Sequence, residues 1–160
     1  MPDNDIAATV RWLRDRIEIF ELFVRYCDAL DHCEWALLDD VFADDVTSTW
    51  ALGTVTLGRA DTVDYITRHW VGLGRTHHII GNFAVDMTGD LAGARVRLRS
   101  HHVGAGSRSD LFQESLCALI ARAVRTSAGW RFDEFAQEIY VMLGTTDVFT
   151  MYSEPDHPVS

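Results

Sequence analysis

Residues 8–38 read ATVRWLRDRIEIFELFVRYCDALDHCEWALL and contain neither glycine nor proline. Their apolar residues recur at helical spacing through Ile17, Phe20, Val24 and Cys27, which is the pattern of an amphipathic helix. Such a helix must bury its apolar stripe against another element. The stretch therefore predicts a long N-terminal helix that packs on the rest of the fold.

Two more helical segments and a hairpin are expected next. Residues 34–42 fit a short second helix, and residues 60–73 fit a third helix with Asp61 as its N-cap. Between them, VTSTWALGTVTLG at 46–58 is rich in β-branched residues and is interrupted by Gly53, which is typical of a β-hairpin.

After residue 74 the sequence is typical of strands, although residues 116–124 also fit a helix. The predicted strands lie within residues 76–87, 94–106, 111–126 and 129–143. We therefore predict an α+β fold, a cone-shaped α+β barrel in which three N-terminal helices pack on a strongly bent, mostly antiparallel sheet. A single domain is expected over residues 5–150, with a C-terminal tail at 151–160.

The composition indicates a folded protein that binds neither nucleic acid nor membranes. The chain has 160 residues and a formal net charge of −10, which repels phosphate backbones and anionic lipid surfaces. No apolar run at the N-terminus has the length of a signal or a membrane anchor. Three cysteines without a Cys-x-x-Cys pair favour a reducing compartment, so we expect a cytoplasmic protein.

Asp31 is the first candidate for chemistry, because helical spacing places it on the apolar stripe one step past Cys27. A carboxylate buried there without a partner would cost several kcal/mol, so a cationic or hydrogen-bonding neighbour is expected. The alternative is that the first helix ends near residue 30 and that Asp31 caps the next one.

Histidines on two predicted strands are the other candidates. Strand alternation in ARVRLRSHHV, residues 94–103, places Ser100 and His102 on the inward face of the sheet. For the pair His77 and His78, alternation assigns one ring to each face without deciding which. A core role for His102 is the simplest alternative, but two polar groups converging on an apolar interior favour a binding site.

One aspartate and two histidines suit general acid/base catalysis, since a carboxylate orients an imidazole whose ordinary pKa lies near neutrality. The same residue types also occur in facial-triad iron sites, an alternative that lacks the usual short ligand spacing here, and we expect no metal. No glycine-rich phosphate-binding loop and no Gly-x-Ser-x-Gly motif is present, so neither a nucleotide cofactor nor a serine hydrolase is indicated.

Four segments in this order resemble the SnoaL-like and scytalone dehydratase-like branch of the nuclear transport factor 2-like superfamily. They are YCDALDHCEWALLDDVFADDVTSTW, GRTHHIIGN, LRSHH and GWRFDEF. The resemblance implies that Asp31, followed by Trp35, pairs with the second histidine of Arg-Thr-His-His, which is His78. It also implies that His102 is the second active-site histidine, and that no cofactor is required.

The dehydratases of this branch hold a water with two tyrosines, and the matching positions here are Leu30 and Trp50. Dehydration of their substrate is therefore not implied. Tyr26 or Tyr65 could supply a hydroxyl, and Trp50 could form an aromatic wall. The list of expected substrate-binding residues is Tyr26, Trp50, Tyr65, Ser100 and Ser115.

The resulting hypothesis is a cofactor-independent dehydratase, isomerase or cyclase for a bulky, oxygenated small molecule, as in natural-product biosynthesis. In it, His78 removes a proton and His102 donates one. The alternative is a non-catalytic ligand-binding or assembly module; epoxide opening lacks an evident Asp/Arg pair. A homodimer or homotrimer is expected, because Phe112, Phe135 and Tyr140 would otherwise lie exposed on the outer face of the sheet.

Overall fold

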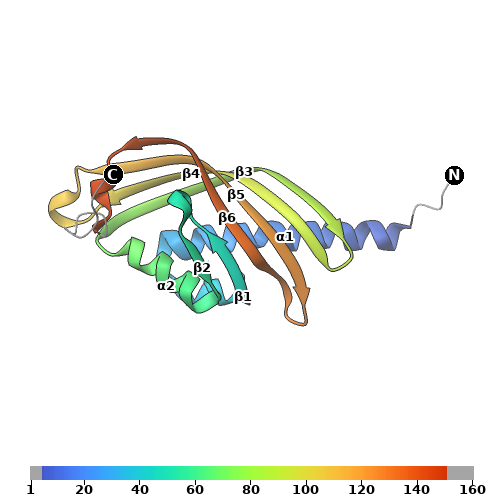
Figure 1. Ribbon diagram of the computed structural model, residues 1–160. Coiled ribbons are helices and arrows are strands. Elements are labelled where there is room, and N and C mark those ends of the chain that lie inside the picture. Colours follow the sequence, from blue (N-terminus) through green and yellow to red (C-terminus); the bar gives the residue numbers. More distant parts are fainter. Residues whose placement is uncertain (1–4, 151–160) are drawn as a thin grey trace.

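The computed structural model describes residues 5–150, which form two α-helices, short 3₁₀ turns and a single six-stranded sheet (Figure 1). The expected tail at 151–160 lies outside the described residues. In chain order the main elements are α1 (Ile6–His32), the 3₁₀ helix η1 (Trp35–Asp40), β1 (Phe42–Thr49), β2 (Val55–Leu57), α2 (Arg59–Trp70), β3 (Leu73–Thr88), β4 (Leu91–Gly104), β5 (Phe112–Thr126) and β6 (Gly129–Gly144). Three further 3₁₀ turns are η2 (Ala51–Gly53), η3 (Gly106–Arg108) and η4 (Thr146–Val148).

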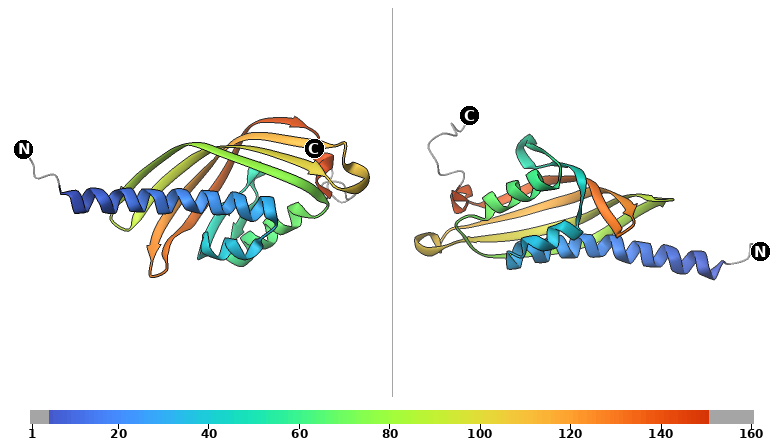
Figure 2. Two further views of the ribbon diagram at one scale, coloured as in Figure 1. Left: turned by 180° about the vertical axis from the view of Figure 1, so that it is seen from behind. Right: turned by 90° about the horizontal axis from the view of Figure 1, so that it is seen from below.

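The sheet is mixed and open, with the strand order β2-β1-β6-β5-β4-β3. All neighbouring strands are antiparallel except β1 and β6, which are parallel. The long strands arch over α1, and α2 lies beside β1 and β2 at one end of the molecule (Figures 1 and 2). This arrangement confirms the predicted cone-shaped α+β class, with helices packed on a bent, mostly antiparallel sheet.

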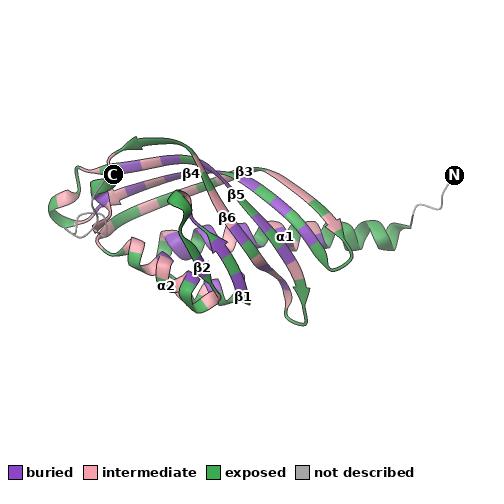
Figure 3. Ribbon diagram, viewed as in Figure 1, coloured by how far each residue is buried: buried purple, intermediate pink, exposed green. Residues whose placement is uncertain are grey.

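Strand β4 shows how the sequence decides which face of the sheet is inside. Its buried and exposed residues alternate strictly from Leu91 to Ser100 (Figure 3). Ala94, Val96 and Leu98 face the core, whereas the arginines between them face solvent. The alternation continues to His102, which is buried as predicted.

Helix α1 packs on the concave side of the sheet. The stripe of side chains that it buries differs from the predicted one. Its fully buried side chains include Ile19, Phe23, Tyr26 and Leu30. Ile17 is 59% exposed, so the predicted start of the stripe was wrong. The reason is the helical phase: Asp15 and Ile19 are buried, so Ile17, two residues from each, lies on the face of α1 that points to solvent.

Several element boundaries differ from the prediction. The second helix is a 3₁₀ helix, and Phe42 already belongs to β1. The N-cap of α2 is Gly58 and not Asp61, which lies in the first turn of that helix. Residues 116–124 are strand, as predicted, with the helical alternative excluded.

Of the three aromatic residues expected on the outer face of the sheet, two are exposed and one is buried. Phe112 and Tyr140 are exposed, at 45% and 53%, but Phe135 is buried among aromatic rings at 2%. Phe135 was wrongly assigned because β6 is irregular where it pairs with β5, with a register shift near Arg122, and this shift changes the face on which its residues lie.

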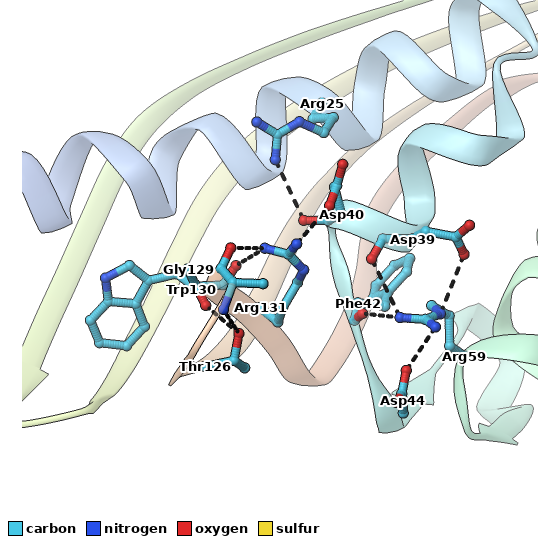
Figure 4. A network of polar contacts seen from close by, with 11 residues as sticks. Arg25, Asp39, Asp40, Phe42, Asp44, Arg59, Thr126, Gly129, Trp130 and Arg131 are labelled. Atoms are coloured by element: carbon cyan, nitrogen blue, oxygen red, sulfur yellow. Dashed lines mark hydrogen bonds and ion pairs between the residues drawn. The ribbon is translucent and has the colours of Figure 1, made fainter.

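Two arginines attach η1 to its surroundings in a polar network (Figure 4). Arg131 of β6 contacts Asp40 at 2.6 Å, and Arg59 of α2 contacts Asp39 at 3.3 Å and Asp44 at 2.7 Å. The aspartates are largely exposed, so each pair stabilises the fold by no more than about 1 kcal/mol. Their role is to hold the turn that follows α1, and hence the end of the helix that carries Asp31.

No helix within residues 5–150 combines the length and the apolar character needed to cross a membrane.

Candidate active site

Asp31 lies in the last turn of α1, where the helix meets β3. The helix ends at His32, and Cys33 adopts a left-handed backbone conformation with φ 55°. Asp31 therefore belongs to the helix, four residues after the buried Cys27, and does not cap a following one. Its side chain is only 16% exposed.

Three strands present their polar inward side chains in two adjacent rows. The first row is formed by His78 of β3, Ser100 of β4 and Ser115 of β5, which are paired in register. The second row is formed two residues away by Thr76, His102 and Gln113. Since side chains two residues apart share a face, all six lie on the concave side of the sheet.

The Asp31 carboxylate binds β3 through three hydrogen bonds. Oδ1 accepts from the Thr76 hydroxyl at 2.7 Å and lies 2.6 Å from Nδ1 of His78, while Oδ2 accepts from the His78 backbone N–H at 2.9 Å. Burial raises the pKa of this carboxyl, but the hydrogen bond and charge of His78 and the Thr76 hydroxyl outweigh it and lower the pKa to about 2. Asp31 is therefore ionised at neutral pH.

An ionised carboxylate can only accept, so it settles the tautomer of His78. Nδ1 must carry the proton that points to Asp31, which leaves Nε2 with a free lone pair when the ring is neutral. The His78 side chain is 2% exposed, whereas that of His77 is 71% exposed. The structure thus places His78 inside, the assignment that periodicity alone left open.

His102 has a different polar environment. Its Nδ1 lies 2.8 Å from the side-chain oxygen of Gln113, which in turn donates from Nε2 to the Ser115 hydroxyl. Because an amide oxygen only accepts, Nδ1 of His102 carries the proton and Nε2 is an acceptor. Burial and the nearby charge of His78 lower the pKa of His102 to about 4, so its ring is neutral at pH 7.

Aromatic rings surround the two imidazoles. Trp70, the last residue of α2, stacks on His78 with a centroid distance of 5.9 Å and meets His102 edge-to-face at 5.6 Å. The His78 and His102 rings are themselves 5.3 Å apart. Phe149, which follows η4, lies 5.2 Å from His102. The histidine pair is therefore enclosed by an aromatic ring at the end of α2 and by another that follows η4.

The predicted substrate-binding residues fall into three environments. Ser100 and Ser115 lie in the row that contains His78. Trp50 and Tyr65 stack on each other at 4.9 Å, and Trp50 donates to Thr56, so its indole is a fixed part of the wall formed with α2. Tyr26 is buried against Phe42 and Phe135.

Four residues of the site were not singled out from the sequence: Thr76, Gln113, Trp70 and Phe149. Gln113 carried a detectable signal, because it shares strand parity with Ser115. Trp70 had none, since a tryptophan at the end of an amphipathic helix is ordinarily a core residue.

No group of three or more His, Cys, Asp or Glu side chains in residues 5–150 is arranged to hold a metal ion. Asp31 and His78 instead direct their polar atoms at each other.

A bent, open sheet closed on its concave side by helices is the fold of the nuclear transport factor 2-like class. Residues 11–136 match the model of the SnoaL-like domain, and the chain belongs to that family.

The relatives extend over most of the chain. The protein Rv2910c of Mycobacterium tuberculosis is 34% identical over 127 residues, which are 77% of this chain and 84% of its own. A candidate scytalone dehydratase from Novosphingobium aromaticivorans superposes with a TM-score of 0.78 at 17% identity, covering 86% of this chain and 91% of its own. The hexachlorocyclohexane dehydrochlorinase LinA-type3 from Novosphingobium barchaimii gives 0.74 at 14% identity, covering 86% and 94%. At these identities the two structures show a shared fold.

Proposed function

We propose that this protein is a cofactor-independent acid/base enzyme in which His78, oriented by Asp31, removes a proton from a small, oxygenated organic substrate. The observation that carries the proposal is the buried 2.6 Å contact between Asp31 and Nδ1 of His78, because it leaves Nε2 as a base. The carboxylate also stabilises the imidazolium that forms when Nε2 takes the proton. Positioned proton transfer of this kind contributes about 10²–10⁴-fold in rate.

The reaction class that fits is elimination or isomerisation. Removal of a C–H proton next to a carbonyl forms an enolate, which either expels a leaving group at the β-carbon or is reprotonated at another carbon. In dehydration, the proton taken by His78 can return to the departing hydroxide, so that water leaves and the base is restored. Two solved structures that share the fold bear names of eliminating enzymes, a dehydratase and a dehydrochlorinase, and these names support the same class.

For His102, the structure favours a role different from the proton donor expected from the sequence. With a pKa of about 4 and Nδ1–H engaged by Gln113, its Nε2 has no proton to donate at pH 7. We assign it the role of acceptor for a substrate hydroxyl, with Gln113 fixing the ring. The concave row of Ser100 and Ser115 provides further hydroxyl groups next to it.

The test uses hydrogen–deuterium exchange, a reaction that requires only the proposed removal of a C–H proton by His78. Hydroxyketones and aromatic ketones are incubated with the enzyme in D₂O, and incorporation of deuterium next to the carbonyl is followed by NMR. We expect His78→Ala to abolish enzyme-dependent exchange and Asp31→Asn to reduce it by about 10²–10⁴-fold. His101→Ala, which removes the outward ring on the neighbouring position of β4, is the matched control. Exchange that survives in both site variants at the wild-type rate would remove the dyad from the mechanism.

A further inference from the structure

The indole N–H groups of three tryptophans can be compared within this chain. Nε1 of Trp50 donates to the Thr56 hydroxyl at 3.1 Å, and Nε1 of Trp130 donates to Oδ1 of Asp15 at 3.2 Å. Nε1 of Trp70 is also buried, although the residue as a whole is only partly buried, and it has no hydrogen-bond partner among residues 5–150. The fold thus satisfies the other two buried indoles and leaves this one unsatisfied.

An unsatisfied donor of this kind is unusual, because buried polar groups nearly always have a partner and leaving one without costs free energy. Each such exception needs an explanation, and a catalytic role, in which a bound substrate supplies the missing acceptor, is one. The location supports that explanation, since the Trp70 ring contacts both His78 and His102. It is the one buried side-chain donor without a partner among the described residues, and it lies against the base itself.

The chemistry of the group suits the step assigned to His78. When the base removes a proton next to a carbonyl, negative charge develops on the carbonyl oxygen and requires a hydrogen-bond donor. The tyrosines that could have donated are absent at Leu30 and Trp50. His102 cannot donate at neutral pH, because its Nε2 is an acceptor. An indole N–H donates only and carries no charge, so it serves an anionic oxygen without taking the proton itself.

We propose that Trp70 is the hydrogen-bond donor that binds the substrate oxygen on which negative charge accumulates, and that the substrate is therefore a carbonyl compound able to form an enolate. The inference rests on the proposed function of His78 as the base. It assigns opposite hydrogen-bonding roles to the two groups beside the base: Trp70 donates to the carbonyl oxygen, and His102 accepts from a hydroxyl.

The experiment replaces Trp70 by β-(3-benzothienyl)alanine, which keeps the bicyclic ring and exchanges the N–H for sulfur. The same replacement at Trp130 is the matched control, because that N–H has a partner in the protein. We expect the control to lower the thermal midpoint through loss of the bond to Asp15, and the replacement at position 70 to leave the midpoint unchanged or raised. A midpoint lowered as much at position 70 as at position 130 would show an internal partner and overturn the proposal.

The second readout uses 4-nitrophenolate, a flat anion that mimics an enolate oxygen. The chain has five tryptophans, so its ¹⁵N spectrum shows five indole resonances, of which that of Trp70 is assigned by its loss in Trp70→Phe. On titration we expect the Trp70 N–H to move downfield while that of Trp130 stays fixed. The replacement at position 70 should weaken binding of the probe about 10-fold or more, and that at position 130 should not change it.

Failure to bind the probe, or binding without movement of the Trp70 resonance, would overturn the assignment of this donor. The two proposals separate cleanly. If His78→Ala abolishes deuterium exchange but the Trp70 resonance does not respond, the base stands and the donor is rejected. If Trp70 responds while His78→Ala exchanges deuterium normally, the indole is a ligand donor and the acid/base function is rejected.

Discussion

Acidification should destabilise this protein through His102 in a window that the structure defines. The ring is 6% exposed, and its pKa falls from an ordinary 6.5 to about 4, chiefly because burial disfavours the charged form. The unfolded chain therefore binds this proton more tightly than the native state does. Stability associated with neutral His102 is complete above pH 6.5 and is lost as the pH falls toward 4.

The magnitude follows from the two pKa values. With 6.5 in the unfolded chain and about 4 in the native state, linkage gives a loss of about 2 kcal/mol between pH 7 and pH 5, and about 3 kcal/mol by pH 4. Asp31 contributes little down to pH 4.5, because its carboxyl is ionised in the native state and, with an ordinary pKa of 3.8, is also mostly ionised in the unfolded chain. The comparison variant is His102→Asn, whose side-chain nitrogen can still donate to Gln113 but does not titrate.

Urea unfolding monitored by tryptophan fluorescence at pH 7, 6, 5 and 4.5 gives the free energy of unfolding of both proteins. We expect the wild type to lose stability relative to His102→Asn by the amounts above as the pH falls. His101→Asn, with its ring on the outer face beside Glu114, controls for removal of a histidine in general. The prediction would be refuted if the free energy of unfolding changed with pH in the same way for wild type and His102→Asn. A His102 NMR resonance that titrates near 6.5 would also refute the conclusion that the ring is buried and neutral.

Three further substitutions separate the site from the scaffold. Thr76→Val removes one hydrogen bond to the Asp31 carboxylate, so that the pKa of Asp31 should rise and the free energy of unfolding at pH 7 should fall by about 1–3 kcal/mol in urea titrations, a loss that should shrink as Asp31 is protonated below pH 4. Gln113→Leu leaves Nδ1 of His102 without its acceptor and should lower the free energy of unfolding by about 1–3 kcal/mol in urea titrations. Asp15→Asn weakens a buried acceptor about 24 Å along α1 from Asp31 and should cost about 1–3 kcal/mol of stability with the exchange rate unchanged; a loss of activity would show coupling that the geometry does not contain.

The fold was predictable from the sequence because its elements have strong periodicity. The strict alternation of β4 determines both the element type and the inward face, whereas the glycine-free first helix determines the element type alone. The errors arise where tertiary packing overrides a local pattern. Ile17 follows the apolar spacing, yet the buried stripe of α1 runs through Asp15 and Ile19, and Phe135 follows a register shift that no local sequence signal marks.

The site was predictable in part, for a related reason. Helical and strand periodicity placed Asp31 and His102 on inward faces, whereas the choice of His78 over His77 came from the family resemblance. Periodicity could not make that choice because Ile79 and its neighbours are apolar on both faces. The unsatisfied state of the Trp70 N–H is beyond any sequence pattern, because it depends on which acceptors the folded chain brings near it.

The low basicity of His102 has a consequence for the base beside it. The two imidazoles are 5.3 Å apart between ring centroids. If His102 carried a proton, its positive charge would repel the imidazolium that forms on His78 when Nε2 takes a proton. Burial that keeps His102 neutral therefore preserves the ability of His78 to accept a proton. Asp31 acts in the same direction, since its negative charge offsets the imidazolium that forms. In the proposed mechanism, proton transfer therefore involves a neutral acceptor, a neutral indole donor and the ion pair that Asp31 forms with protonated His78.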